Sequence, residues 1–154
     1  MTDQPVGKIV AIAVRTAKEG PMQELTKATA RAGRGIKGDL RAWTHRGVTL
    51  ISSEDWQQVT SELGIALPWH TRRANVLVTG LTMADLIRRT VRFGEVTLEV
   101  RAETLPCELM DRLHAGLWNA LKPNCRAGVY GKVLTGGEFK VGDSVEVIAQ
   151  PPTT

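Results

Sequence analysis

Short apolar segments that alternate with polar positions recur along most of the chain. Residues 6–15 are rich in β-branched side chains and predict an opening strand, and residues 96–101 alternate as a half-buried strand does. Residues 23–32 also alternate, which favours a strand over a short helix. Further strands are predicted at residues 47–51, 76–78, 128–134 and 139–147, with a hairpin signal at 135–138 between the last two.

Helical spacing of apolar side chains occurs in residues 52–64 and again in residues 108–121. The first helix has Ser52 or Ser53 as its candidate N-cap and Gly64 as its stop, and a short helical turn is expected at residues 82–86. Many short strands, few helices and no alternation of strand and helix predict a mainly β fold. We expect a closed or nearly closed β-barrel with two or three short helices.

The length of 154 residues suits one domain that folds without disulfides or metal. We expect a single domain over residues 1–154, with its core at about 6–147 and a frayed tail at 148–154. The two cysteines and an N-terminus without a signal-peptide pattern favour a reducing cytoplasm. No apolar run approaches the length of a membrane span, so no membrane partner is expected.

Basic residues are concentrated in two segments, residues 31–46 and residues 72–92. The chain carries 20 Lys and Arg against 16 Asp and Glu, a net charge of +4. Glycines interleave with the cations of the first segment, and exposed backbone amides together with guanidinium groups suit phosphate. A small anionic cofactor or a nucleic acid would satisfy this pattern, and a solvated basic face is the structural alternative.

Cys107 follows Pro106, which fixes its own φ and biases Leu105 toward an extended conformation. Such a cysteine falls where a strand gives way to a loop or helix and can present its sulfur to a ligand. A thiolate is a strong nucleophile and a soft metal ligand. The alternative is a small buried hydrophobic residue, which is the role of most free cysteines.

Other chemistries are less well supported. Cys107, His114 and Cys125 have the spacing C-x6-H-x10-C, which matches no compact zinc site and lacks a fourth ligand. His114 follows Cys107 by seven residues, and a nearby imidazole is what activates the thiol of cysteine hydrolases. Nothing in the sequence, however, marks an oxyanion hole or a third catalytic group. Nucleic-acid binding fits a pI of about 9.4, yet one Tyr and two Phe offer few stacking platforms.

Four motifs stand in order along the chain: GIKGD at 35–39, RRANV at 72–76, PC at 106–107, and AGVYGKV at 127–133 followed by VGDSV at 141–145. Together they resemble the MOSC domain of molybdenum cofactor sulfurases, of mitochondrial amidoxime-reducing components and of small stand-alone bacterial proteins. The resemblance spans about residues 6–147 and implies a β-barrel of the pyruvate-kinase-barrel-like type. The family is also associated with pyridoxal phosphate.

The resemblance implies binding of a molybdenum cofactor of the molybdopterin type. The motif cysteine of the family falls on Cys107, as a molybdenum ligand or a sulfur carrier. Arg72, Arg73 and Asn75 match the R-x-N-type motif and would bind the pterin phosphate. The further cofactor-binding candidates are Lys37, Arg126, Tyr130 and Gly131.

For residues outside this set we expect structural roles. Asp39 is expected to cap backbone amides in a turn, Gly142 and Asp143 to help close the barrel, and Cys125 to be core or a resolving thiol. The sequence leaves open whether the chain carries cofactor or acts as a molybdenum-dependent oxidoreductase or sulfurtransferase. A cofactor-accepting enzyme or a redox partner is expected.

Some relatives carry an additional C-terminal helical segment or an N-terminal β-barrel partner domain. Neither flanks the motifs here, so independent reduction of N-oxygenated substrates is not expected.

Overall fold

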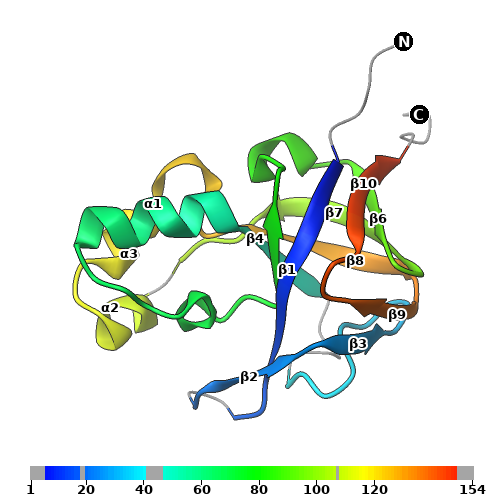
Figure 1. Ribbon diagram of the computed structural model, residues 1–154, viewed down its shortest axis with the longest axis horizontal. Coiled ribbons are helices and arrows are strands. Elements are labelled where there is room, and N and C mark those ends of the chain that lie inside the picture. The colour runs from blue at the N-terminus through cyan, green and yellow to red at the C-terminus, as the bar shows by residue number, and fades with distance from the viewer. Residues whose placement is uncertain (1–5, 18–19, 41–46, 107, 149–154) are drawn as a thin grey trace.

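The computed structural model describes residues 6–17, 20–40, 47–106 and 108–148. The barrel strands are β1 (Val6–Arg15), β4 (Val48–Ser52), β5 (Val76–Thr79), β6 (Thr90–Phe93), β7 (Val96–Glu103), β8 (Val129–Thr135) and β10 (Ser144–Ile148). They pair in the order β10-β6-β7-β8-β4-β5-β1, and β1 also pairs with β10, which closes the ring (Figure 1). The expected mainly β fold and closed barrel are confirmed.

The strand predicted at residues 23–32 is divided in two. β2 (Met22–Leu25) pairs with the C-terminal end of β1, while β3 (Lys27–Ala30) leaves the barrel sheet and pairs with β9 (Gly137–Lys140). The predicted hairpin at 135–138 is therefore wrong, because β8 pairs with β7 and β4 and not with β9. The last predicted strand is also divided, since Gly142 turns the chain at φ +96° between β9 and β10.

Helix α1 (Ser53–Leu63) begins and ends at the predicted residues. The Ser52 hydroxyl accepts a hydrogen bond from the Asp55 amide at 3.1 Å, and Gly64 adopts a left-handed conformation at φ +68°. The helix connects β4 to β5, which lie side by side in parallel. The expectation of no β-α-β unit is wrong here, because a parallel pair needs such a crossover.

The second helical segment is broken into α2 (Leu109–Leu113) and α3 (Leu117–Leu121). His114 is extended and Gly116 is left-handed at φ +89°, so the backbone cannot continue the helix through them. Short 3₁₀ turns complete the fold: η1 (Trp69–Arg72), η2 (Met83–Leu86) and η3 (Pro123–Cys125). Figure 1 shows α1, α2 and α3 gathered beside the barrel, on the same side of it.

Two groups of buried apolar side chains hold this arrangement together among the described residues. The first fills the barrel, where the Phe93 and Phe139 rings meet edge to face with centroids 5.1 Å apart. The second lies between the barrel wall and the helices, where Trp56 and Val59 of α1 pack with Ile51 of β4. The helices are thus fixed against one end of several barrel strands, and this is where the site lies.

No helix within the described ranges is long and apolar enough to span a membrane. The predicted tail begins at Ile148, which the structure places in β10, and residues 149–154 lie outside the described residues. Residues 41–46 of the first basic segment also lie outside them.

Candidate functional site

A pocket of about 290 Å³ lies between the barrel and α2, and we call it the Arg72 pocket. Its polar lining is contributed by Arg15, Thr49, Arg72, Arg73, Asn75 and Thr104, and its remaining lining by Gly47, Leu105, Leu109 and Met110. These residues come from the end of β1, the start of β4, the loop before β5, the segment after β7, and α2. The pocket therefore brings together segments that are distant in sequence.

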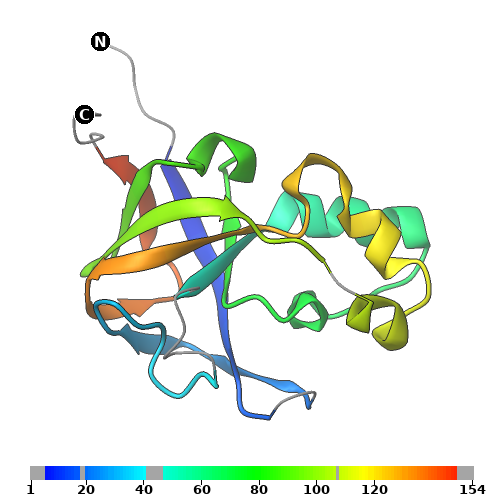
Figure 2. The ribbon, with the colours of Figure 1, turned by 180° about the vertical axis from the view of Figure 1, so that it is seen from behind.

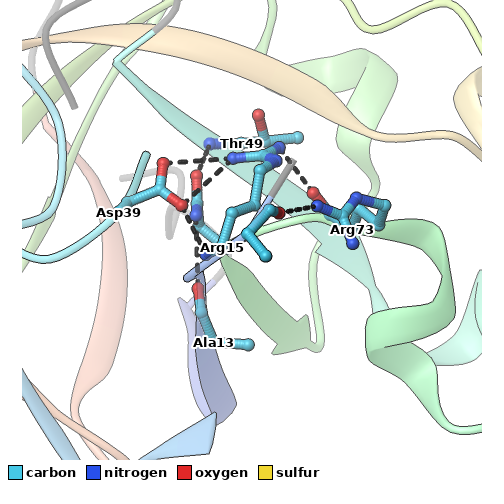
Figure 3. Close-up of polar contacts among 7 residues, drawn as sticks. Ala13, Arg15, Asp39, Thr49 and Arg73 are labelled. Atoms are coloured by element: carbon cyan, nitrogen blue, oxygen red, sulfur yellow. Dashed lines mark hydrogen bonds and ion pairs between the residues drawn. The ribbon is translucent and has the colours of Figure 1, made fainter. Parts of the chain in front are cut away.

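Arg15 ends β1, and its side chain contacts both Asp39 and Arg73 (Figure 3). Its guanidinium donates to the Asp39 carboxylate at 3.1 Å and to the Arg73 carbonyl oxygen at 2.5 Å. The side chain of Asp39 is only 1% exposed and that of Arg15 is 13% exposed. An ion pair so shielded from water is costly to break, so Arg15 is held in place at the pocket wall.

Asp39 also accepts a hydrogen bond from the backbone amide of Arg15 at 2.6 Å. Asp39 therefore does bond a backbone amide, but this amide lies on β1, 24 residues away, and not in the turn where capping was predicted. The turn that contains Lys37 and Gly38 is thereby attached to the barrel.

Arg73 has a left-handed backbone at φ +66°, which is uncommon for a residue with a side chain. Its guanidinium donates to the carbonyl oxygen of Gly20 and, at 3.0 Å, to that of Ala17. The side chain therefore ties the segment after β1 to the loop before β5, and it brings a buried positive charge to the pocket.

Arg72 is 7% exposed, and its Nε donates to the carbonyl oxygen of Ala127 at 3.0 Å. That bond uses one edge of the guanidinium and orients its plane. Since Ala127 precedes β8, this contact connects the RRANV motif with the AGVYGKV motif.

Asn75 is 1% exposed and is engaged by backbone on both sides. Its side-chain oxygen accepts from the Thr49 amide at 3.1 Å, and its side-chain nitrogen donates to the Ala13 carbonyl oxygen at 3.2 Å. Both polar ends of the amide are thus used to join β1 to β4. The geometry gives Asn75 a positioning role in the pocket wall.

Thr104 is 5% exposed, and its hydroxyl has no hydrogen-bond partner among the residues that the structure describes. A buried hydroxyl without a partner is unfavourable by about 1–3 kcal/mol. Because Thr104 lines the Arg72 pocket, a bound polar molecule is a natural partner for it.

The predicted cofactor-binding residues are only partly brought together. Arg72, Arg73 and Asn75 line the Arg72 pocket, whereas Tyr130 lines a neighbouring pocket and Lys37 lies in an exposed turn. Gly131 lies in β8, where an added Cβ would stand 2.5 Å from the carbonyl oxygen of Glu99.

Arg126 is directed to a different partner. Its guanidinium forms a bidentate pair with Glu62 of α1, with both N···O distances at 2.8 Å. This pair raises the pKa of Arg126 and lowers that of the Glu62 carboxyl. Arg126 therefore fixes α1 against the segment before β8.

Cys107 lies outside the described residues. Leu105 and Leu109 stand on either side of it in sequence, and both line the Arg72 pocket.

Cys125 is half-buried, and burial raises the pKa of its thiol, with further raising by the nearby Glu103 and Asp55 carboxylates. Little thiolate forms at neutral pH under these conditions, so the environment suits a core cysteine better than a resolving thiol. Among the described residues, His, Cys, Asp and Glu side chains form no group of three or more that could hold a metal ion.

Arg15, Thr49 and Thr104 are pocket residues that the sequence patterns did not identify. Arg15 is the basic residue that ends a buried strand, which is a weak signal. Thr104 comes two residues before Pro106, and this proximity to the PC motif is the one sequence signal that could have identified it as a site residue.

Comparisons with known proteins agree with this fold. The family model described as MOSC domain matches residues 37–146. The solved structure of the YuaD protein from Bacillus subtilis superposes with a TM-score of 0.81 at 19% identity, covering 96% of this chain and 98% of that one.

Two structures of YiiM are also similar. The protein from Geobacillus stearothermophilus has a TM-score of 0.75 at 17% identity, covering 93% of this chain and 75% of that one. The protein from Escherichia coli has a TM-score of 0.72 at 13% identity, covering 96% and 72%. At identities this low, the similarity of these structures shows a shared fold alone. A comparison with curated proteins gives no match.

Proposed function

Because this chain belongs to the MOSC domain family, it is a molybdenum-cofactor-related domain, and we propose that it binds the molybdopterin form of that cofactor in the Arg72 pocket. The observation that carries the proposal is the pocket itself, where Arg72 and Arg73 bring positive charge and Arg15, paired with Asp39, brings a guanidinium, beside the buried Thr104 hydroxyl.

The residues present fit such a molecule. A pterin phosphate is an oxyanion, and guanidinium groups in a shielded pocket bind oxyanions through charge-assisted hydrogen bonds. We assign direct phosphate contacts to Arg72 and Arg15, with Arg73 adding charge. The Thr104 hydroxyl would bond a polar edge of the ligand, and Asn75 would hold the strands that carry these groups.

Cys107 is the proposed thiol of the site, as a molybdenum ligand or as the carrier of a sulfur atom. When bound, the cofactor supplies a molybdenum centre held by the pterin dithiolene, whose coordination a thiolate can complete. Apolar Leu105, Leu109 and Met110 line the pocket near this position in sequence and would exclude water from the ligand.

The test is elemental and pterin analysis of protein purified from a host that makes the cofactor. We expect molybdenum and pterin in similar molar amounts in the wild-type protein. Cys107→Ser should fold normally but lose molybdenum, and Arg72→Lys should lose both molybdenum and pterin because the guanidinium fork is gone. Arg92→Lys is the matched control, since Arg92 pairs with Glu146 on the exposed surface and should change neither.

Wild-type protein with neither molybdenum nor pterin would overturn the proposed function. Unchanged molybdenum content in Cys107→Ser would remove the ligand role of that residue alone. Mass spectrometry of intact protein separates the two roles of the thiol, because a sulfur carrier gains the mass of one sulfur atom that a reductant removes.

A further inference from the structure

A second pocket, of about 530 Å³, lies on the outside of the barrel at β7 and β8, and we call it the Arg34 pocket. Arg101 of β7, Lys132 of β8 and Arg34 of the loop after β3 line it together with Tyr130. β7 and β8 run side by side across the barrel face seen in Figure 2. No carboxylate is among the described residues that line it.

The positive charge of the Arg34 pocket is only partly neutralised. Glu99 pairs with Arg101 at 2.9 Å and lies opposite Lys132 in the strand register. Within the described ranges, no acidic side chain forms an ion pair with Arg34 or Lys132. Cations gathered from three chain segments with one nearby carboxylate repel one another, and an anion would relieve this.

Backbone geometry opens the same surface. Gly33 is left-handed at φ +73°, and its amide donates to the Val133 carbonyl oxygen at 2.9 Å, which holds the loop of Arg34 against β8. A Cβ added to Gly33 would meet nothing within 4 Å, so the pocket is open at this point. The loop that carries Arg34 is therefore fixed to the barrel, while the side of the loop at Gly33 stays accessible.

Gly47 lines both the Arg34 pocket and the Arg72 pocket, so the two pockets are neighbours. Gly47 is left-handed at φ +59°, and a Cβ there would overlap the carbonyl oxygen of Gly131. The backbone at position 47 therefore packs too closely against β8 to carry a side chain. Arginines thus line both of these neighbouring pockets.

We propose that the Arg34 pocket binds the phosphate group of a small molecule, with Arg34 and Lys132 as its principal contacts. Arg101 adds charge, and Tyr130 lines the same pocket. This phosphate belongs either to the distal end of the ligand in the Arg72 pocket or to a separate molecule. The proposal goes beyond the function of the Arg72 pocket and does not require that a pterin binds there.

The binding test uses inorganic pyrophosphate and amide chemical shifts measured by NMR on protein purified without cofactor. We expect the Gly33 and Lys132 amides to shift saturably in the wild-type protein. In the double variant Arg34→Gln/Lys132→Gln the dissociation constant should rise at least tenfold. The double variant Lys8→Gln/Arg92→Gln, which removes two cations from other strands, should bind as the wild type does.

Absence of a saturable shift at Gly33 and Lys132 would overturn the proposal, as would an unchanged dissociation constant in Arg34→Gln/Lys132→Gln. The remaining amide signals of that variant show whether it is folded, and its exposed positions make folding the expected result.

The source of the phosphate is decided by the same probe on cofactor-loaded protein. If one ligand fills both pockets, loading abolishes the pyrophosphate shifts and Arg34→Gln/Lys132→Gln retains less pterin. If the ligands are separate, the shifts persist after loading and pterin content is unchanged. If no cofactor loads, the proposed function fails while the pyrophosphate result on unloaded protein still stands.

Discussion

The carboxylate of Asp39 accepts hydrogen bonds from both the backbone amide and the guanidinium of Arg15, at 2.6 and 3.1 Å. One acidic side chain thus fixes the end of β1, the glycine-rich turn and the arginine that faces the Arg72 pocket. The relationship explains how an exposed turn can influence a pocket formed mainly by other elements.

Asp39→Ala should destabilise the protein by about 3 kcal/mol, because it leaves the guanidinium of Arg15 buried without its counter-ion. Chemical denaturation measures this change. The control is Lys27→Ala, which breaks an ion pair of exposed side chains with Glu138 and should change stability by less than about 0.5 kcal/mol. Equal losses of stability in the two variants would contradict the claim that burial makes the Arg15–Asp39 ion pair costly to break.

Gly47→Ala should destabilise by more than about 3 kcal/mol, since it adds a clash with the carbonyl oxygen of Gly131 to the cost of a left-handed alanine. Gly64→Ala supplies the comparison, because Gly64 is also left-handed but its Cβ position is empty. It should lose about 1 kcal/mol. A small loss at Gly47 would mean that the backbone at this position moves easily away from Gly131.

Thr104→Val should leave the stability of cofactor-free protein unchanged or raise it by up to about 1 kcal/mol, since the hydroxyl it removes has no partner among the described residues. The same variant should retain less cofactor. Thr79→Val is the contrast, because the Thr79 hydroxyl donates to Glu54 at 2.8 Å. That variant should lose about 0.5–1 kcal/mol and retain cofactor normally.

Glu54→Gln should be less stable than the wild type near neutral pH, and the difference should disappear in acid. Burial alone would raise the pKa of this carboxyl, but hydrogen bonds led by those from Gly80 and Thr79 lower it below its ordinary value of 4.5. The ionised form therefore stabilises the fold above pH 4.5, and this contribution is lost as the pH falls through the folded-state pKa. Solvent exposure limits the effect to about 0.5 kcal/mol.

Asp55→Asn should change the pH dependence of stability in the opposite direction to Glu54→Gln. Burial raises the pKa of the Asp55 carboxyl above its ordinary value of 3.8, and Arg126 offsets this only in part. The charged form is thus disfavoured in the folded state, so the variant gains stability relative to the wild type as pH rises from 3.8 through the folded-state pKa. Thermal unfolding of both variants across this range is the measurement, and parallel pH profiles would contradict both assignments.

Features with local causes were predictable from the sequence. The alternation of residues 96–101 marked β7, and Ser52 and Gly64 marked both ends of α1, because strand faces and helix caps depend on neighbouring residues. The pairing of β3 with β9 and the parallel contact of β4 with β5 were not predictable. Both depend on residues far apart in sequence, and no local pattern encodes such contacts.

The candidate site shows the same division. The structure places Arg72, Arg73 and Asn75 of the RRANV motif in the lining of one pocket, and their binding of a phosphate stays a prediction. The role of Asn75 depends on Thr49 and Ala13, which only the fold brings near. Arg15 was missed for a similar reason, since a basic residue at a strand end is common. Its place at the pocket follows from Asp39, which lies 24 residues away.

The pairing of β1 with β10 has a consequence for how the protein forms in the cell. Val6 pairs with Glu146, so the ring can close only when both the first and the last described strands are present. During synthesis β1 can pair with β2 and β5 first, but its pairing with β10 must await the residues up to Ile148. We therefore expect closure of the ring to be a late step of folding, because it joins the two strands most distant in sequence.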